Sequence, residues 1–362
     1  MMRLLALPRY ARAGASSRYR FYQYFPYLQS RDFQIESCPL LEDRYIQNLN
    51  AGSGQSKIMI GMAYLRRVAA LLRKDRFDLI WLQGEVFPWM PAGIERVLMR
   101  AGVPYVVDYD DAWFHRYDQH PNKHVRRMLG QKIDAVMRGA ALVAAGNQYI
   151  AARARAAGAK HVAILPTVVD LARYPSAPMT RPADKFVIGW IGSSSTAKYL
   201  LQLQKPLQRL CSEAEVELVV VGAAGLKMEG VQLRELAWSE SSEVELMQGF
   251  DVGVMPLPDT PWERGKCGLK LIQYMATFLP VIASPVGVNV EIVEPGQQGY
   301  LASHDDDWVA HLSELRSNAH LRNAMGIAGR NRVEARYSLS QAAPLLESLL
   351  VECINRSGSS LA

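Results

Sequence analysis

Short apolar runs alternate with longer amphipathic stretches along almost the whole chain. The runs have the length of buried strands, and the stretches between them have helical spacing, so the pattern predicts α/β architecture with mostly parallel sheets. In the first half, strands are predicted at Arg3–Leu7, Phe33–Ser37, Leu79–Leu82, Tyr105–Asp108, Ala141–Ala144 and His161–Leu165, and helices at Ile58–Arg73, Gly93–Ala101, His124–Arg138 and Gln148–Ala156.

A proline-rich stretch, Leu171–Asp184, separates this series from a second one. There, strands are predicted at Phe186–Ile191, Glu217–Val221, Val252–Met255, Val281–Ala283 and Gly299–Leu301, and helices at Tyr199–Cys211, Ser242–Met247, Leu269–Thr277, Asp307–Arg316 and Leu321–Ala335. We therefore predict an N-terminal Rossmann-like domain over residues 1–172 and a C-terminal one over 173–338. The amphipathic stretch at about 339–356 is expected to pack back on one of them. Ligands of open α/β sheets bind at the carboxyl ends of the strands, so we expect a cleft between the two domains there.

Charge is distributed unevenly over the 362 residues, whose formal net charge is +6. Residues 1–170 carry 24 basic and 14 acidic side chains, a net charge of +10, whereas residues 171–362 carry 17 and 21, a net charge of −4. A basic first half suits an anionic partner, such as acidic lipid headgroups or a phosphorylated acceptor. No nucleic-acid-binding motif is present, which argues against nucleic acid. A solvated basic face is the alternative.

The cysteines and the apolar runs narrow the class of protein further. The four cysteines lie far apart, so neither a zinc site nor a disulfide framework is expected, and a reducing cytoplasm fits best. No apolar run approaches the roughly 18 residues that span a bilayer, and the N-terminus has no signal-peptide core. We expect a cytoplasmic protein, and a peripheral position on the inner face of the plasma membrane is left open.

Two segments of the first half follow predicted strands and carry candidate acceptor-site residues. Gly14–Arg20 contains Ser16, Ser17, Arg18 and Arg20, which suit an anion or an acceptor, although a solvated loop has the same composition. Asp108, Asp110 and Asp111 crowd three carboxylates into four positions, followed by His115. Such repulsion needs a cation, a metal or a shared proton to offset it. A carboxylate there can orient an acceptor hydroxyl; capping of a following helix is the other interpretation, and no further metal ligands are visible.

Two segments of the second half suit a phosphate. Gly189–Lys198 follows a predicted strand with glycines, hydroxyls and a lysine, but lacks the spacing of a P-loop or of a dinucleotide fingerprint. A serine N-cap would explain the same residues. Arg264–Gly287 begins as a basic, glycine-punctuated loop and continues into a predicted helix, with Lys266 and Lys270 four residues apart. A lysine in a first helical turn opposes the helix dipole, which a bound anion would compensate; a surface lysine is the alternative.

The order of these segments resembles a known family. IGWIGSSSTAKYL, FDVGVMPL, WERGKCGLKLIQYMA and PVIASPVG are similar to the donor domain of retaining glycosyltransferases of family 4 with the GT-B fold, and ASSRYRFYQY and VVDYDDAWF resemble a bacterial surface-polysaccharide branch. The resemblance implies a metal-independent hexosyl- or deoxyhexosyltransferase without a cofactor. Its nucleotide-diphosphate sugar would bind the C-terminal domain, and its glycan or lipid-linked acceptor the N-terminal one.

Carried over by position, the resemblance implies three groups of site residues. Asp110, Lys198 and Lys266 would be catalytic. The donor would be bound by Gly192, Ser193, Ser194, Ser195, Lys198, Lys266, Cys267, Gly268, Leu269, Lys270 and Gln273, and the acceptor by Ser16, Ser17, Arg18, Arg20, Asp111 and His115. Four positions depart from the family. Gly265 and Gln273 stand where glutamates are usual, Trp190 replaces an arginine, and Asp110 stands where many members carry a histidine. A catalytically silent nucleotide-sugar or glycan-binding protein is therefore the alternative. A sugar-nucleotide epimerase is disfavoured because the second half lacks an acid/base set.

Overall fold

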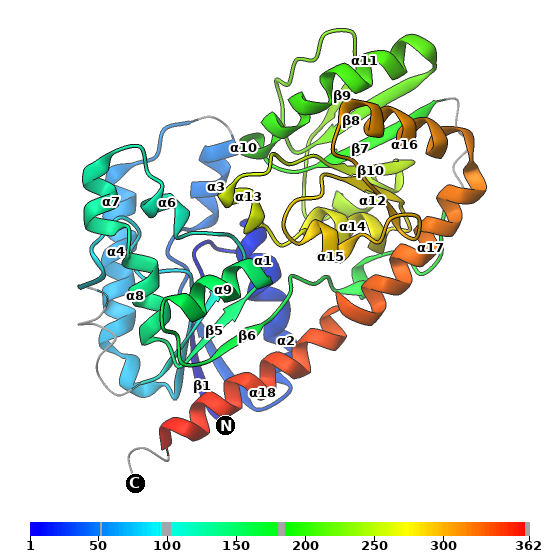
Figure 1. Cartoon of the computed structure of the whole chain (residues 1–362). Helices are drawn as coiled ribbons and strands as arrows, with labels where there is room; N and C mark the ends of the chain where they lie inside the picture. Colours follow the sequence, from blue (N-terminus) through cyan, green and yellow to red (C-terminus); the bar gives the residue numbers. More distant parts are fainter. Residues whose placement is uncertain (51–52, 94, 96–102, 180–184, 359–362) are drawn as a thin grey trace. The chain divides into compact units, whose positions relative to one another are not determined.

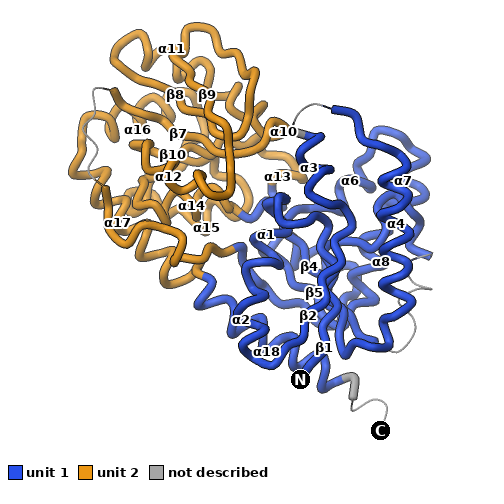
Figure 2. The backbone as a smooth tube through the Cα atoms, turned by 180° about the vertical axis from the view of Figure 1, so that it is seen from behind, with its two compact units in different colours: residues 1–167, 264–267, 339–362 blue, residues 168–263, 268–338 orange. Residues whose placement is uncertain are grey.

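The computed structural model describes residues 1–50, 53–93, 95, 103–179 and 185–358. They form two compact units (Figure 2). The first unit contains residues 1–167, 264–267 and 339–362, and the second contains 168–263 and 268–338. The C-terminal helix thus belongs with the first unit, as does the short segment Arg264–Cys267, whose neighbours on both sides belong to the second.

The first unit is built on a six-stranded parallel sheet in the order β2-β1-β3-β4-β5-β6. Its strands β1, β5 and β6 are labelled in Figure 1. Its central strands are buried along their whole length, which is why they read in the sequence as continuous apolar runs. The strands are β1 (Met2–Leu7), β2 (Phe33–Ser37), β3 (Leu79–Gln83), β4 (Tyr105–Tyr109), β5 (Leu142–Ala145) and β6 (Val162–Ile164).

Helices cover this sheet, and the long C-terminal helix α18 (Leu339–Gly358) packs against α2, β3 and β4. The other α-helices of the unit are α1 (Ala15–Arg20), α2 (Phe25–Gln29), α3 (Asp43–Asn50), α4 (Lys57–Leu72), α6 (His115–Asp118), α7 (Lys123–Leu129), α8 (Lys132–Gly139) and α9 (Gln148–Ala156); η1 (Tyr22–Tyr24) and η2 (Lys74–Arg76) are 3₁₀ turns.

The second unit repeats the architecture with the strand order β12-β11-β10-β7-β8-β9, again all parallel. Its strands are β7 (Phe186–Ile191), β8 (Val216–Val221), β9 (Leu233–Leu236), β10 (Val252–Met255), β11 (Val281–Ala283) and β12 (Gly299–Leu301). Its core joins β7, β8 and β10 to α11 and α16 through residues such as Ile188, Leu207 and Leu312.

The helices of the second unit follow the same alternation. They are η3 (Leu171–Arg173), α10 (Ser194–Ala197), η4 (Lys198–Leu203), α11 (Gln204–Glu213), α12 (Glu243–Gln248), α14 (Leu269–Ala276), α15 (Asn289–Ile292), α16 (Asp305–Ser317) and α17 (Ala319–Arg336), and α13 (Pro261–Arg264) ends at the segment that belongs to the first unit.

The predicted α/β fold with two parallel sheets is confirmed, most element boundaries shift by one or two residues, and four local differences are larger. The helix predicted at His124–Arg138 is two helices, because Gly130 lies where a Cβ would be 2.3 Å from the Arg126 carbonyl oxygen and the chain turns there. The helix predicted at Tyr199–Cys211 opens with a 3₁₀ turn. Strand β9, half-exposed at the sheet edge, lacks the apolar run that revealed the others. The Gly14–Arg20 segment is helical rather than a loop. The helix predicted at Gly93–Ala101 lies almost wholly outside the described residues.

Candidate active site

The carboxyl ends of β1, β3, β4 and β5 bring together polar side chains that are far apart in the sequence. The first sheet reverses its strand order between β1 and β3, and a reversal of this kind is where open α/β sheets bind ligands. Ser16 and Ser17 follow β1, Gln83 ends β3, Asp110 follows β4 and Asn147 follows β5.

Four of these residues form the Asp110 cluster, which consists of Ser16, Ser17, Gln83 and Asp110. The Ser16 hydroxyl donates to Asp110 Oδ2 and accepts from Gln83 Nε2 at 2.5 Å. The Ser17 hydroxyl donates to Gln83 Oε1 at 2.7 Å. Gln83 therefore fixes both serines, and Ser16 in turn fixes one oxygen of Asp110.

The other carboxylate oxygen of Asp110 is buried and accepts no hydrogen bond from the described residues. Burial raises the pKa of Asp110, although the Ser16 hydrogen bond and Arg20 act in the opposite direction. A buried acceptor atom without a donor costs free energy, which a donor from a ligand would recover. Asp110 does not cap a helix, because α6 begins at His115 after Phe114.

Asp108, two residues earlier in the chain, is buried and forms an ion pair with Arg20. Both of its oxygens accept from the Arg20 guanidinium at 2.8 Å, and both side chains are fully buried. Burial alone would lower the pKa of Arg20, but the facing Asp108 carboxylate raises it above the ordinary value. Arg20 also donates to the Leu165 carbonyl oxygen at 2.8 Å. It therefore holds the sheet edge together, and we do not retain it as an acceptor ligand.

Lys266 lies in the first unit, beside Asp111. Its ammonium is 3.4 Å from Asp111 Oδ1. Burial raises the pKa of Asp111, and Lys266 counteracts that shift. Asn147 holds the same segment in place, because its amide donates to the carbonyl oxygens of Gly265 and Lys266 at 2.9 Å while its Oδ1 caps α9 through the Ile150 N–H.

The side chains of three further residues that were predicted to belong to the site point into the protein interior. Cys267 is buried, and burial raises the pKa of its thiol well above the ordinary value, so it does not supply a thiolate. Arg18 is 2% exposed and donates to the Arg12 carbonyl oxygen. His115 uses both ring nitrogens, at 2.8 Å from Asp118 Oδ1 and from the Tyr149 hydroxyl.

In the second unit the strand order reverses between β7 and β10. The segment that follows β7, residues 192–198, includes the short helix α10 and is called the Gly192 loop. Ser193 is the N-cap of α10, and Ser194, Ser195 and Lys198 are exposed. Gly192 is required by close packing, since a Cβ there would lie 2.5 Å from the Trp190 ring and 2.9 Å from Lys270 Cε. The Lys270 ammonium lies 5.2 Å from the centre of the Trp190 ring.

Helix α14 thus brings Lys270 to the end of β7. Gly268 is the N-cap of the helix, Leu269 begins it, and Gln273 is buried within it. A glutamate at position 265 would not fit without rearrangement, because a Cβ there would lie 2.4 Å from that of Ala112. Close packing against Ala112 in the first unit therefore explains why glycine stands at position 265.

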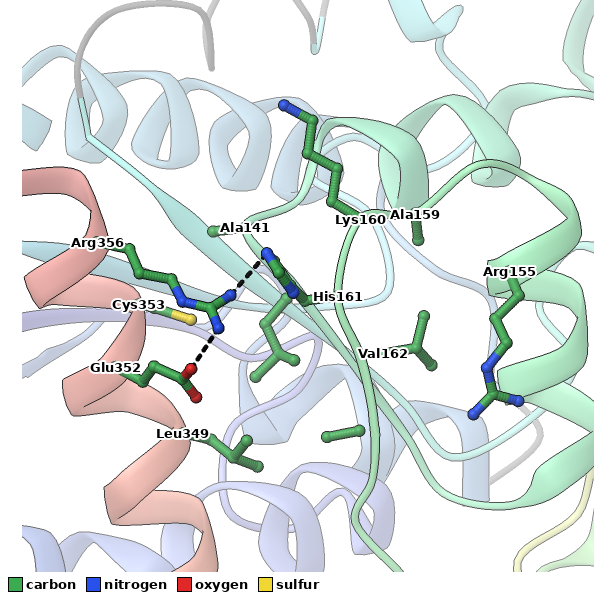
Figure 3. Close-up of a pocket in the computed structure, with 12 residues that line it drawn as sticks. Ala141, Arg155, Ala159, Lys160, His161, Val162, Leu349, Glu352, Cys353 and Arg356 are labelled. Carbon is green, nitrogen blue, oxygen red and sulfur yellow. Dashed lines mark hydrogen bonds and ion pairs between the residues drawn. The ribbon is translucent and has the colours of Figure 1, made fainter. Parts of the chain in front are cut away.

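A cavity of about 490 Å³ lies at the opposite end of the first sheet, between the start of β6 and α18 (Figure 3). Arg356 lies there between Glu352 and His161, whose Nε2 is 2.6 Å from the guanidinium. Lys160 and Arg155 do not converge on Arg356 in this view. This cavity is separate from the strand ends that carry the predicted site residues.

Sequence reasoning missed Gln83 and Asn147, although Gln83 ends an apolar strand and Asn147 lies two residues beyond another, and this position was the available signal. It also missed Glu263, which is buried and accepts hydrogen bonds from Tyr199 and Thr260. No local pattern marks Glu263, because its partner Tyr199 is 64 residues away.

Two family models match the chain, one in each unit. Residues 5–167 match the glycosyl transferase 4-like domain, and residues 185–318 match the glycosyl transferases group 1. The chain therefore belongs to the glycosyltransferases, and its two parallel sheets are those of the GT-B fold. No curated protein sequence matches it.

Solved structures that resemble the chain support the same fold. A sucrose-phosphate synthase from Thermosynechococcus elongatus aligns with a TM-score of 0.73 at 14% identity, over 98% of this chain and 100% of that one. Anabaena HepE, in complex with UDP and glucose, aligns with a TM-score of 0.71 at 16% identity, over 97% and 100%. The lipopolysaccharide outer core galactosyltransferase WaaB aligns with a TM-score of 0.60 at 12% identity, over 100% of both chains.

Proposed function

We propose that this protein transfers a sugar, with retention of anomeric configuration and without a metal, from a nucleotide-diphosphate sugar to a glycan or lipid-linked acceptor. The observation that carries the proposal is a buried oxygen of Asp110, at the carboxyl edge of a glycosyltransferase 4-like domain, that has no hydrogen-bond partner in the part of the chain that the structure describes. An acceptor hydroxyl is the donor that this oxygen lacks. Asp110 would orient the hydroxyl and stabilise positive charge as the anomeric bond breaks.

The second unit would bind the donor through the Gly192 loop and α14. Bond breaking places negative charge on the departing diphosphate, which backbone N–H groups of Ser193–Ser195 and the ammoniums of Lys198 and Lys270 would stabilise. These cations can replace a divalent metal in that role. Lys266 would act at the acceptor side, where it balances the charge of Asp111.

The sugar is expected to be a hexose or deoxyhexose, and the pathway bacterial cell-surface polysaccharide synthesis. Two observations support this choice. The segments ASSRYRFYQY and VVDYDDAWF, which resemble that branch, form α1 and the end of β4 in the Asp110 region. WaaB, a structural neighbour, is a lipopolysaccharide galactosyltransferase.

A thermal-shift screen tests the donor half of the proposal. UDP, GDP and dTDP, each free and as sugar conjugates, should raise the melting temperature when they bind, by about 2.7 kcal/mol of stability at a hundredfold excess over Kd. UDP is the first to test because HepE binds it. Donors that bind are then incubated with extracted lipid-linked glycans, and transfer is followed by mass spectrometry. A complete absence of nucleotide binding would sink the proposal.

The second candidate is a catalytically silent binder of nucleotide sugars. It is favoured by Gly265 and Gln273, which stand where the family usually has glutamates. At position 265, Ala112 leaves no room for a side chain. This candidate predicts donor binding with neither transfer nor donor hydrolysis. The same screen followed by a hydrolysis assay separates the two.

We also propose that the first unit contacts an anionic membrane surface through α4. Ile58, Met62, Leu65 and Leu72 recur at helical spacing and are each more than half exposed. Lys57 and Arg76 near the helix ends are exposed and basic, which suits acidic headgroups. Among the described residues no helix is long and apolar enough to cross a bilayer.

Replacing Ile58 and Leu65 with glutamate should weaken binding to phosphatidylglycerol vesicles by about tenfold or more, since two apolar contacts are lost and two negative charges added. Co-sedimentation measures this. Ile327→Glu, on an exposed helix position of the second unit, is the matched control and should bind like wild type. Equal binding by all three proteins would exclude α4 as the contact.

A further inference from the structure

A second polar group lies at the carboxyl edge of the first sheet, next to the Asp110 cluster. Its centre is Glu85, which follows β3 and is 3% exposed. The carboxylate is 2.7 Å from Lys132 Nζ, 3.4 Å from a terminal nitrogen of Arg9 and 3.9 Å from one of Arg116. The Tyr117 hydroxyl donates to it at 2.8 Å. We call Glu85, Arg9, Arg116 and Lys132 the Glu85 cluster.

Positive charge exceeds negative charge in this cluster. Lys132 is shared with a second carboxylate, Glu95, at 2.9 Å, so three cations face two anions. A third carboxylate, Asp111, also interacts electrostatically with Arg116, but it is paired with Lys266 at 3.4 Å, so the excess of positive charge remains. Arg67, also buried nearby, donates to the carbonyl oxygens of Pro8 and Cys38, with no carboxylate partner among the described residues, and adds a further positive charge. Excess charge out of water is costly unless an ion of opposite sign offsets it.

Arg116 is the member of the cluster that is least satisfied within the protein. Its side chain is 25% exposed, and the 3.9 Å to Glu85 is too long for a hydrogen bond. The described residues give its guanidinium no hydrogen-bond partner. Burial lowers the pKa of Arg116, and the like charge of Arg9 lowers it further. Glu85 offsets part of this cost, and an anion bound at Arg116 would offset more of it.

Trp113 holds the two arginines together. The guanidinium carbons of Arg9 and Arg116 lie 4.8 and 5.4 Å from the centre of its ring. Gly84 makes room for that ring, since a Cβ there would lie 2.0 Å from it, and the residue has a φ of +71°. The arginines are therefore positioned by a rigid aromatic surface, which suits recognition of an oxyanion by planar guanidinium groups.

The Glu85 cluster is continuous with the Asp110 cluster. Gln83, which fixes Ser16 and Ser17, also accepts a hydrogen bond from the Arg9 backbone N–H at 2.9 Å, and Glu85 is two residues beyond it. A ligand whose hydroxyl reaches Asp110 would therefore extend toward the arginines along the ends of neighbouring strands β1, β3 and β4.

We propose that Arg116, supported by Arg9, binds an oxyanion of the acceptor, a phosphate or a carboxylate, so that the preferred acceptor is negatively charged. This inference rests on the proposed glycosyltransferase function only in calling the ligand an acceptor. The binding of the anion itself stands independently. Arg116 is a specificity-determining residue in this view, and Asp110 remains the group that meets the reacting hydroxyl.

The test measures anion binding to the full chain by isothermal titration calorimetry, with pyrophosphate as the phosphate probe and glucuronate as the carboxylate probe. Arg116→Gln should weaken binding of at least one probe by about tenfold to hundredfold, the range for a charge-assisted hydrogen bond. Arg116→Lys should retain part of the affinity, because lysine keeps the positive charge but lacks the planar guanidinium that can donate two parallel hydrogen bonds to an oxyanion. The probe that loses affinity identifies the oxyanion.

Two controls keep the result specific. Arg127→Gln removes an exposed charge of the same unit and should leave affinity within about twofold of wild type. Lys205→Ala removes an exposed cation of the second unit and should likewise leave the affinity within about twofold of wild type. Equal affinity in Arg116→Gln and wild type would overturn the proposal, as would an equal loss in Arg127→Gln. Nucleotide binding is measured separately, so a failed donor screen leaves this result interpretable.

Discussion

Replacing Asp110 with asparagine should abolish most sugar transfer while leaving the protein as stable as wild type or more stable. The variant keeps an oxygen for the Ser16 hydrogen bond and loses the charge that would orient the acceptor hydroxyl. Positioned carboxylates of this kind contribute about 10² to 10⁴ in rate, so kcat should fall by about that factor. Transfer assays and thermal melts of the same preparations measure both quantities.

The expected stability follows from the sign of the pKa shift. Burial raises the pKa of Asp110 in the folded chain above that of the unfolded chain. The folded state then holds its proton more tightly, so stability declines as the pH rises from the ordinary range near 4 through the raised value. At neutral pH the ionised carboxylate destabilises the fold, and asparagine removes that cost.

The same shift predicts the pH dependence of transfer. Asp110 stabilises developing positive charge only when it is ionised, so activity should fall as the pH is lowered through its raised pKa. This acidic limb should be missing from the residual activity of Asp110→Asn. Asp75→Asn, at an exposed position, should behave like wild type. Wild-type activity in Asp110→Asn would remove this carboxylate from the mechanism.

Replacing Lys270 with methionine should impair the donor half of the reaction. Methionine preserves the packing of the side chain against Trp190 and Gly192 and removes the ammonium. Loss of a group that stabilises developing negative charge lowers kcat by about 10² to 10³. Nucleotide-diphosphate affinity should fall by about tenfold, since one charge-assisted contact is lost.

The matched control is Lys205→Met, which removes an exposed lysine from α11 of the same unit. It should retain wild-type donor affinity. Steady-state kinetics with varied donor separates the effect on kcat from that on KM. If Lys270→Met stays within about threefold of wild type in both, Lys198 and the backbone N–H groups of the Gly192 loop must hold the diphosphate without it.

The first unit shows which parts of a site a sequence can predict. Asp110 and Ser16 stood out because each follows a strand in a local pattern of polar and small residues. Gln83, which connects them, ends a buried strand and has no such pattern around it. Arg20 resembled a ligand-binding arginine until its pairing with Asp108, 88 residues away, was known. The local sequence predicts that a polar residue lies near the carboxyl edge of the sheet, but it does not predict which distant residue will be its hydrogen-bond or ion-pair partner.

The segment Arg264–Cys267 makes the same point for the second half. Its position before α14 predicted a role in donor binding. In the structure, Asn147 and Asp111 hold it in the first unit, while Lys270 lies beside Gly192. The contacts with Asn147 and Asp111 have no signal in the sequence, because these residues follow β5 and β4, far from position 264 along the chain.

The sequence by itself determined the α/β class, two parallel sheets and a glycosyltransferase-like order of motifs, because strand length, helical spacing and glycine positions are local properties of the chain. Only the tertiary structure decided which strand-end side chains meet, since parallel strands bring together residues that are tens of positions apart. It also decided where charge is left unbalanced. The free oxygen of Asp110 and the excess positive charge around Glu85 both depend on distances between such residues.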